Sequence, residues 1–279
     1  MLIQIHMLQN YAPSNLNRDD TGAPKDAVFG DVQRGRISSQ AIKRSIRRSP
    51  IFEEAFGERG LLAQRTNRLP GQIDKALETL GADEETRRAI VQRIPEIGKR
   101  EGGQPSAEDE EGVLKTRILV FLPADEVMQV ARKLWTLYQE QGWAKFAELG
   151  IGKIETAMQH ELPRSVDISM FGRMTTSSAF EDVQAAVQVA HAISTNAATP
   201  QFDYFTAVDD LSGEPGAGMI GNVEFNSNTY YKYFNIHWEK LVENLGGDAG
   251  VALEAVNALL EAAALAQPTG KQNTFAAHN

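Results

Sequence analysis

The stretch Asp31–Pro50, DVQRGRISSQAIKRSIRRSP, combines the pattern of a short capped helix with a dense block of positive charge. Ser38 is a favourable N-cap residue, because a serine hydroxyl can accept a hydrogen bond from the N–H groups of a first helical turn. Ile42 and Ile46 are four residues apart and therefore share one helix face. Pro50 disfavours helical backbone at the residue before it. We predict a helix that starts after Ser38, buries the two isoleucines and ends before Pro50.

The positive charge of this stretch stands out in a chain whose net charge is −9. Residues 32–49 contain no acidic residue and six basic ones, namely Arg34, Arg36, Lys43, Arg44, Arg47 and Arg48. The last four form two pairs spaced by four residues, so they make two rows in which like charges repel by about 0.2–0.5 kcal/mol per pair. A helix N-terminus also offers N–H groups to a phosphate. We therefore expect a polyanion such as single-stranded RNA here; a solvated amphipathic helix is the alternative interpretation.

Composition narrows the class of protein further. The 279 residues are 42% hydrophobic and contain no cysteine, which is typical of a folded protein in a reducing cytoplasm. Residues 1–50 carry a net charge of +4 and the remainder −13, so one basic face is expected on an otherwise acidic protein. The N-terminus lacks a signal-peptide pattern, and no apolar run approaches the roughly 20 residues of a membrane span. We expect a soluble, cytoplasmic protein with no membrane contact.

Hydrophobic periodicity predicts mixed helices and strands without a repeated βα unit, which indicates an α+β fold. An irregular loop is expected from about residue 10 to Arg36, before the helix that follows Ser38. Strands are predicted over residues 1–8, 115–123, 165–174 and 229–238. Further helices are predicted over residues 52–99 with a break at Gly81, and over residues 123–141, 181–194 and 248–266. Residues 98–112 are predicted to form an exposed loop.

No pattern in the sequence indicates a catalytic or metal site. The five histidines are far apart and show none of the spacings typical of metal ligands, and no phosphate-binding glycine motif or nucleophile elbow is present. Acidic pairs occur at Asp19–Asp20 and at Asp209–Asp210, where they could bind Mg²⁺ or simply be solvated turn residues. We predict no catalytic residue, no metal and no cofactor.

Several long segments resemble the CasC family, the guide-RNA-binding backbone subunit of the type I-E CRISPR Cascade complex. The first segment is NLNRDDTGAPKDAVFGDVQRGRISSQAIKRSIRRS, residues 15–49. Later segments are VDISMFGRM at 166–174, VAHAISTNAATPQFDYFTAVDDL at 189–211, GAGMIGNVEFNSNTYYKYFNI at 216–236 and PTGKQNTFAAHN at 268–279. The resemblance covers the chain from end to end.

The resemblance implies a hand-shaped architecture and an assembly. A modified RRM-like, ferredoxin-like palm would comprise residues 1–51 and 166–279, with helical fingers inserted at 52–165 and a β-hairpin thumb at about 194–224. Copies would stack into a helical filament along the guide RNA, each thumb displacing one guide base of a neighbour. The remaining bases would pair with target DNA, so the protein would read backbone shape while base pairing reads sequence. Other Cascade subunits would be further partners.

The resemblance also assigns RNA contacts to individual residues. Guide phosphates would be held by Lys43, Arg44, Arg47 and Arg48, after the basic approach of Arg34 and Arg36. Hydrogen bonds to the same backbone would come from Asn17, Arg18, Ser39 and Gln40. Base contacts would come from Met170 and Phe171 with the charge of Arg173, and from the thumb residues Phe202, Tyr204 and Phe205, for which packing inside the hairpin is the alternative. Contacts to RNA or to the next subunit would come from Lys271 and Gln272.

Two other functions and one departure from the family stay open at this level. Asp209 and Asp210 would suit a backbone subunit that cuts target RNA with a thumb-loop aspartate. A phosphate-binding enzyme that uses the basic helix is the third interpretation. Family members usually continue for some tens of residues past FAAHN and add further sheet. The sheet of this chain is therefore expected to be incomplete or to be completed by a partner.

Overall fold

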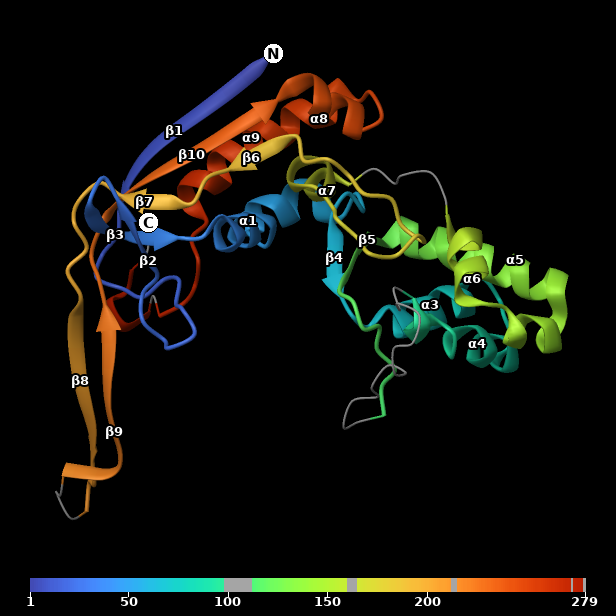
Figure 1. The fold of residues 1–279 in the computed structure, drawn as a ribbon, viewed down its shortest axis with the longest axis horizontal. Coiled ribbons are helices and arrows are strands. Elements are labelled where there is room, and N and C mark those ends of the chain that lie inside the picture. Colours follow the sequence, from blue (N-terminus) through green and yellow to red (C-terminus); the bar gives the residue numbers. More distant parts are fainter. Residues whose placement is uncertain (98–111, 160–164, 212–214, 272, 278–279) are drawn as a thin grey trace. The chain divides into compact units, whose positions relative to one another are not determined.

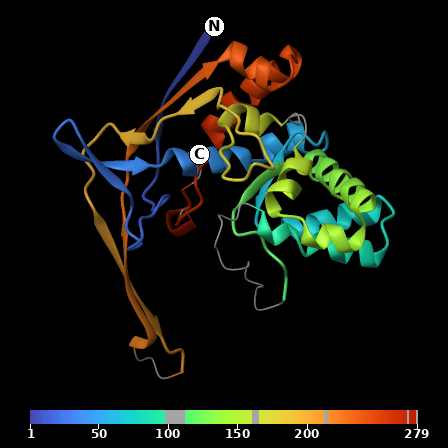
Figure 2. The same cartoon turned by 45° about the vertical axis from the view of Figure 1, so that its right-hand side comes forward.

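The computed structural model of the chain describes residues 1–97, 112–159, 165–211, 215–271 and 273–277, and these residues form two compact units (Figures 1 and 2). Unit 1 comprises Met1–Ala55, Val187–Glu239 and Leu253–Asn279, and unit 2 comprises Phe56–Ala186 and Lys240–Ala252. The sequence-based division assigned residues 166–186 to the palm, whereas the contacts group them with unit 2. The helices and strands are mixed as an α+β fold requires, which confirms the predicted fold class.

A six-stranded antiparallel sheet organises unit 1 (Figure 1). Its strands are β1 (Leu2–Asn10), β2 (Asp26–Phe29), β3 (Val32–Ile37), β6 (Val187–Val189), β7 (Ala192–Ser194) and β10 (Thr229–His237). The order is β1-β10-β7-β3-β2, and β6 also pairs with β10. In β1, Ile5 is buried while Gln4 and His6 are exposed, which confirms the N-terminal strand and its alternation.

Helix α1 (Ser39–Arg47) and the part of α9 (Ala249–Leu265) that follows residue 252 pack against this sheet, α1 at β6 and α9 at β10. Unit 1 also contains the short helices α2 (Pro50–Phe52) and η3 (Asn273–Phe275). The side chain of Lys232 on β10 is buried, and its Nζ donates to the carbonyl of Ala263 at 3.0 Å and lies 5.4 Å from the ring centroid of Tyr11. The ammonium group therefore caps the last turn of α9, where the helix dipole favours a positive charge.

A two-stranded antiparallel hairpin, β8 (Gln201–Val208) and β9 (Pro215–Phe225), also belongs to unit 1 and extends away from the sheet (Figures 1 and 2). It lies in the region in which a thumb hairpin was expected. Within the described part of the chain no third strand joins it. Two-stranded hairpins are marginally stable in water without further packing, so the ribbon is suited to contacts outside its own unit.

Unit 2 packs helices around a short antiparallel pair, β4 (Ala63–Thr66) and β5 (Val120–Pro123). Its helical elements are α3 (Leu69–Thr79), α4 (Glu84–Val91), η2 (Ile94–Glu96), α5 (Ala124–Glu148), α6 (Ile151–Met158) and α7 (Val166–Phe171). The π-turn η1 (Glu53–Gly57) and helix α8 (Trp238–Asn244) each span a boundary between the units. The predicted helix from Pro123 and the break at Gly81 are confirmed. The α5 span bends at Gly142, whose φ of 70° ends the regular helix there.

Three predictions of element type are wrong. Strand β4 lies within residues 52–99, which were predicted to be helical, because pairing with β5 gives it an extended form. Residues 166–171 form helix α7 rather than a strand, because the buried Asp167 accepts hydrogen bonds from the Ser165 hydroxyl at 2.6 Å and from the Ala63 N–H at 3.0 Å. Six residues are too few for periodicity to separate the two structures. Residues 187–194 form strands β6 and β7 rather than a helix, because pairing with β10 overrides the helical spacing of the alanines and valines.

The predicted loop up to Arg36 is also wrong, since β2 and β3 form a hairpin there. Its turn residues Gly30 and Asp31 have φ of 61° and 59°. Two consecutive positive φ angles are those of the tight turns that match the twist of paired strands. In the sequence, the Gly30–Asp31 pair between Phe29 and Val32 was the signal that could have predicted this hairpin turn.

Candidate nucleic-acid interface

Helix α1 begins and buries its side chains as predicted. The Ser38 hydroxyl accepts a hydrogen bond from the Ala41 N–H at 3.2 Å, with the backbone of Ser38 extended as an N-cap requires. Ile42 and Ile46 are 3% and 0% exposed. The helix ends at Arg47, and Ser49 caps the short helix that starts at Pro50. The burial of Ile42 and Ile46 fixes which side of α1 faces solvent.

The basic rows of α1 differ in exposure. Arg44 and Arg48 are exposed, whereas Lys43 and Arg47 are half-buried and interact with neighbouring groups. Arg44 and Arg48 border a cavity of about 400 Å³ that is otherwise lined by Ser45 and Ser49 and by the chain after α9, including Thr269. Two exposed guanidinium groups at one cavity rim can bind neighbouring phosphates along a backbone.

The loop of residues 14–25 is fastened to the start of α1. The side-chain oxygen of Asn17 accepts the Ser38 N–H at 2.8 Å, and the Lys25 N–H donates to the Asn17 carbonyl at 2.9 Å. The predicted contact of Asn17 with RNA stays a prediction, but its oxygen already has the role of positioning α1. Arg18, in contrast, is exposed and lines a cavity of about 540 Å³ with its neighbours up to Gly22.

The C-terminal segment joins the same loop. The Lys271 N–H donates to the Asn15 carbonyl at 2.7 Å, and the Gly270 N–H donates to the Leu16 carbonyl at 3.2 Å. A Cβ at Gly270 would lie 2.4 Å from both carbonyl oxygens, so only glycine permits this approach. Lys271 is thereby placed beside the Asn17–Arg18 loop. Gln272 lies outside the described residues.

Arg34 and Arg36 lie on strand β3 rather than on a flexible approach, which corrects the sequence-based picture of their setting. Arg34 donates to the carbonyls of Phe29 at 2.9 Å and Ser194 at 3.0 Å. Arg36 donates to the Asp26 carbonyl at 2.8 Å, and its Nη1 lies 3.3 Å from the Nδ1 of His191. Burial, followed by the charges of Arg36 and then Lys25, lowers the pKa of His191. A neutral His191 can accept the Arg36 hydrogen bond.

Ser39 and Gln40 lie in the first turn of α1, where a phosphate would meet the helix N-terminus. Ser39 is 9% exposed and Gln40 is exposed. Gln40 can therefore donate to an incoming group, whereas Ser39 has little surface. The helix has no acidic residue in its first turn, so nothing in that turn repels an anion.

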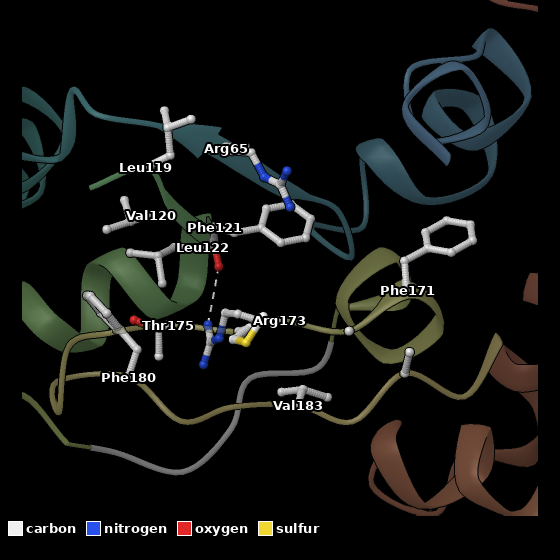
Figure 3. A pocket seen from close by; sticks show the side chains of 13 residues that line it. Arg65, Leu119, Val120, Phe121, Leu122, Phe171, Arg173, Thr175, Phe180 and Val183 are labelled. Atoms are coloured by element: carbon white, nitrogen blue, oxygen red, sulfur yellow. Dashed lines mark hydrogen bonds between the residues drawn. The ribbon is translucent and has the colours of Figure 1, made fainter. Parts of the chain in front are cut away.

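In unit 2, the segment of residues 170–174 differs from its prediction. Met170 is 0% exposed and belongs to the interior, so it offers no surface to a base. Arg173 is also buried; its Nη1 donates to the Phe121 carbonyl at 3.2 Å (Figure 3) and forms an ion pair with Glu126 at 2.7 Å. Phe171 is half-buried at a cavity, and Met174, which sequence reasoning missed, is 90% exposed. Met170 lies within α7 and Met174 lies beyond its end at Gly172, whereas a strand over residues 165–174 would place both methionines on one face.

The hairpin aromatics fall into two groups. Phe202 and Tyr204 share one face of β8 and are 64% and 65% exposed, so packing inside the hairpin does not account for them. Phe205 faces the other side and packs on Gly221, where an added Cβ would lie 2.3 Å from the Phe205 ring. Phe202 and Tyr204 are therefore the thumb aromatics that remain accessible to a base.

The acidic pairs Asp19–Asp20 and Asp209–Asp210 are exposed. Asp209 accepts the Leu211 N–H at 2.8 Å in an exposed turn. Asp19 accepts the N–H groups of Thr21 at 2.9 Å and Ala23 at 3.0 Å; hydrogen bonds, first from the Thr21 hydroxyl, lower the pKa of Asp19. Throughout the described ranges, no group of three histidine or acidic side chains is placed to hold a metal ion. No described helix is long and apolar enough to cross a membrane.

A comparison with models of known protein families gives a match over nearly the whole chain. The model of the CT1975-like protein family matches residues 3–279. The chain belongs to this family. A comparison with curated proteins found no match.

Solved structures give a second line of similarity. A chain of a CRISPR RNA-guided surveillance complex in a pre-nicking state is 32% identical, with a TM-score of 0.77, and the match covers 100% of this chain and 76% of that one. A chain of another CRISPR RNA-guided surveillance complex is 28% identical, with a TM-score of 0.66, over 97% of this chain and 73% of the other. The chain thus shares its α+β fold with chains of such complexes, consistent with an RRM-like palm.

Proposed function

We propose that this CT1975-like protein is a non-catalytic, RNA-binding backbone subunit of a CRISPR surveillance complex of the type I-E Cascade kind. The observation that carries the proposal is the surface around α1: Arg44 and Arg48 are exposed at a cavity rim beside the fastened N-terminal loop and C-terminal segment. Similarity to subunits of RNA-guided surveillance complexes supports guide RNA as the polyanion. Other subunits of such a complex are then its partners.

The proposed mechanism is electrostatic and independent of sequence. Exposed arginines on α1 and Arg18 and Lys271 beside it contact guide phosphates, and Gln40 adds a hydrogen-bond donor. Contacts to phosphate fix the path of the guide but carry no sequence information. Base pairing with target DNA then supplies specificity.

The hairpin supplies the link between copies in this proposal. Phe202 and Tyr204 contact a guide base held by a neighbouring copy, and stacking of copies in the cytoplasm extends the α1 surfaces into a continuous track. The exposed aromatics support this role, because apolar side chains inserted beside a base can disturb its stacking. The absence of catalysis is part of the proposal: the turn-bound Asp209 holds the hairpin end, and cleavage falls to another component.

The proposal is tested by purification and filter binding. We expect the protein from its native host to copurify with short RNA of uniform length, and the Arg44→Ala, Arg48→Ala double variant to lose about tenfold or more in affinity for single-stranded RNA regardless of sequence. A matched control is Arg88→Ala with Arg132→Ala, which removes the same charge from exposed positions of unit 2. Equal RNA affinity in the two double variants would contradict the proposed surface.

A further inference from the structure

The six-stranded sheet of unit 1 has an outer face that carries exposed apolar side chains. Side chains alternate along a strand, so Ile5 and Phe234 point toward the helices, while the residues on either side of them point outward. The register places one outward row across four neighbouring strands, formed by Leu8, Tyr231, Ile193 and Arg36. Leu8 is 69% exposed, and Phe29, at the end of β2 on the same face, is 66% exposed. Exposed apolar side chains that gather on one face mark an interaction surface.

Charge distinguishes this outer face from the rest of the chain. Its outward positions include Arg34 and Arg36, and in the six strands, all of which the structure describes, none of these positions is aspartate, glutamate or lysine. The chain as a whole has a net charge of −9. Contacts between proteins are enriched in tyrosine and arginine and depleted of lysine, aspartate and glutamate at their centre. The outer face therefore has the composition of a protein contact.

Hydrogen bonds hold the aromatic rings of the outer face in place. The Tyr231 hydroxyl lies 2.6 Å from the Nδ1 of His6, and the Gln4 side-chain amide donates to the Tyr233 hydroxyl at 2.9 Å. The ring centroids of His6 and Tyr233 are 5.0 Å apart. Side chains that are already fixed lose little conformational entropy when a partner covers them.

Helix α9 packs on the other side of the same sheet, where the Lys232 Nζ donates to the Ala263 carbonyl. Its buried side chains include Ala255 and Leu259, so the opposite side of the helix faces solvent. That exposed side, the α9 stripe, consists of Leu253, Glu254, Asn257, Leu260 and Glu261. Leu253 and Leu260 are 55% and 40% exposed, and α9 contains no lysine or arginine. The α9 stripe is therefore apolar and acidic.

The outer face and the α9 stripe complement each other in polarity and charge. Two outer faces in contact would bring arginine against arginine, and two α9 stripes would bring glutamate against glutamate, which is unfavourable. An outer face on an α9 stripe instead brings arginines toward glutamates and aromatic rings toward leucines. Because these two surfaces lie on opposite sides of the sheet, such a contact can repeat from copy to copy and build an open filament when the rotation does not close a ring.

We propose that the outer face of the sheet docks on the α9 stripe of a second copy, so that copies join head to tail through unit 1. The proposal rests on the proposed function, because it assigns surfaces through which copies stack in addition to the hairpin. Neither surface includes Arg44 or Arg48, which stay available to the guide. A nucleic acid fits the outer face less well, since Arg34 and Arg36 are half-buried and already donate to backbone carbonyls.

The test measures binding to two single-stranded RNAs: the length that one bound copy protects from nuclease, and twice that length. Contact between copies makes binding to the longer RNA cooperative, and we expect the second wild-type copy to bind roughly tenfold more tightly than the first. Leu8→Glu on the outer face and Leu260→Lys on the α9 stripe should each remove most of that cooperativity, because each places a charge against like charges. Both variants should bind the shorter RNA as the wild type does.

An equal mixture of the two variants tests the pairing of unlike surfaces. Leu8→Glu keeps an intact α9 stripe and Leu260→Lys keeps an intact outer face, so one copy of each can still form the contact. We expect the mixture to regain cooperativity on the longer RNA, although each variant alone lacks it. Cooperativity that is lost in both variants and is not regained in the mixture would overturn the head-to-tail contact.

The matched controls are Val28→Glu and Trp143→Lys. Val28 is 75% exposed on β2 but lies outside the outer face, and Trp143 is 52% exposed in unit 2, so both variants should keep full cooperativity. Circular dichroism verifies that every variant is folded.

The remaining outcomes separate this inference from the proposed function. Binding of the longer RNA without cooperativity by the wild type, or with unchanged cooperativity by both surface variants, would overturn the contact and leave the proposed function standing. A loss of affinity for the shorter RNA in Leu8→Glu but not in Val28→Glu would also overturn it and assign the outer face to nucleic acid. Failure of the wild type to bind the shorter RNA would refute the proposed function and this inference with it.

Discussion

The two arginine-bearing regions of this protein use the same side chain in opposite ways. On α1, Arg44 and Arg48 are exposed on a helix without acidic residues. In unit 2, Arg173 is buried against Glu126. An exposed guanidinium acts at a distance on phosphates and is weakened by salt. A buried, neutralised guanidinium acts only through the direction of its N–H groups. The sequence alone shows arginines in both regions. The burial of their side chains in the structure distinguishes the two roles.

The largest expected effect comes from breaking the buried pair. Arg173→Met removes the guanidinium that pairs with the buried Glu126 carboxylate, which should lower the free energy of unfolding by about 3–5 kcal/mol. The double variant Arg173→Met, Glu126→Leu should recover most of that loss, because the buried carboxylate is removed together with the guanidinium. Urea denaturation of both variants measures the difference. A single variant as stable as the wild type would show that the pair is not buried in solution.

Lys232 is a third kind of cation, because it is buried and its ammonium group caps α9, and it should make stability depend on pH. Burial lowers the pKa of Lys232 from 10.5 to about 8. Between these values the unfolded chain holds a proton that the folded chain has released, so stability rises with pH there and is flat below about pH 8. From pH 8 to 9.5 the free energy of unfolding should increase by about 2 kcal/mol.

This pH effect is measured by denaturant unfolding at several pH values, with Lys232→Met as the comparison. The variant should lack the rise. Above about pH 10 the raised pKa of the buried Tyr230 acts in the opposite direction, so the measurement stays below that value. An identical rise in the variant would assign the effect to other groups.

A smaller effect is expected where the loop meets α1. Asn17→Ala removes the oxygen that accepts the Ser38 N–H, which should lower the free energy of unfolding by about 1 kcal/mol. RNA affinity should fall several-fold, since the loop and Arg18 lose their position beside the helix. Thermal unfolding and filter binding measure the two effects, and Asn10→Ala is a control on an exposed strand end. A change in stability without a change in RNA affinity would show that the loop of residues 14–25 does not contribute to RNA binding.

A segment could be predicted from the sequence when the interactions that stabilise it lie within the segment itself. It could not be predicted when those interactions involve residues far away in the sequence. Helix α1 was predictable, because Ser38, Ile42 and Ile46 supply its cap and buried face within one segment. Strands β6 and β7 were not, because only pairing with β10 gives residues 187–194 their extended form. Helix α7 depends on the Asp167 carboxylate, which accepts the Ala63 N–H of a strand about a hundred residues earlier.

The same rule applies to the candidate site. The cluster on α1 was visible as a run of charge, and the hairpin aromatics as a run of rings. The burial of Met170 and the exposure of Met174 were not visible, because Met170 lies within α7 and Met174 lies beyond its end at Gly172. The ion pair between Arg173 and Glu126 joins two segments that nothing in the sequence links. Arg34 and Arg36 were found as residues, but the turn at Gly30 that places them on a strand was not.

The salt dependence of RNA binding tests the central claim, that the exposed arginines of α1 hold the backbone of a guide RNA. The slope of log affinity against log salt concentration is measured for the wild type and for Arg44→Ala, Arg48→Ala with one single-stranded RNA. Each lost phosphate contact lowers the slope by about 0.7, so the double variant should have a slope shallower by about 1.4 and an unchanged free energy of unfolding. Equal slopes with equal affinities would contradict the account, because the RNA would then be bound elsewhere.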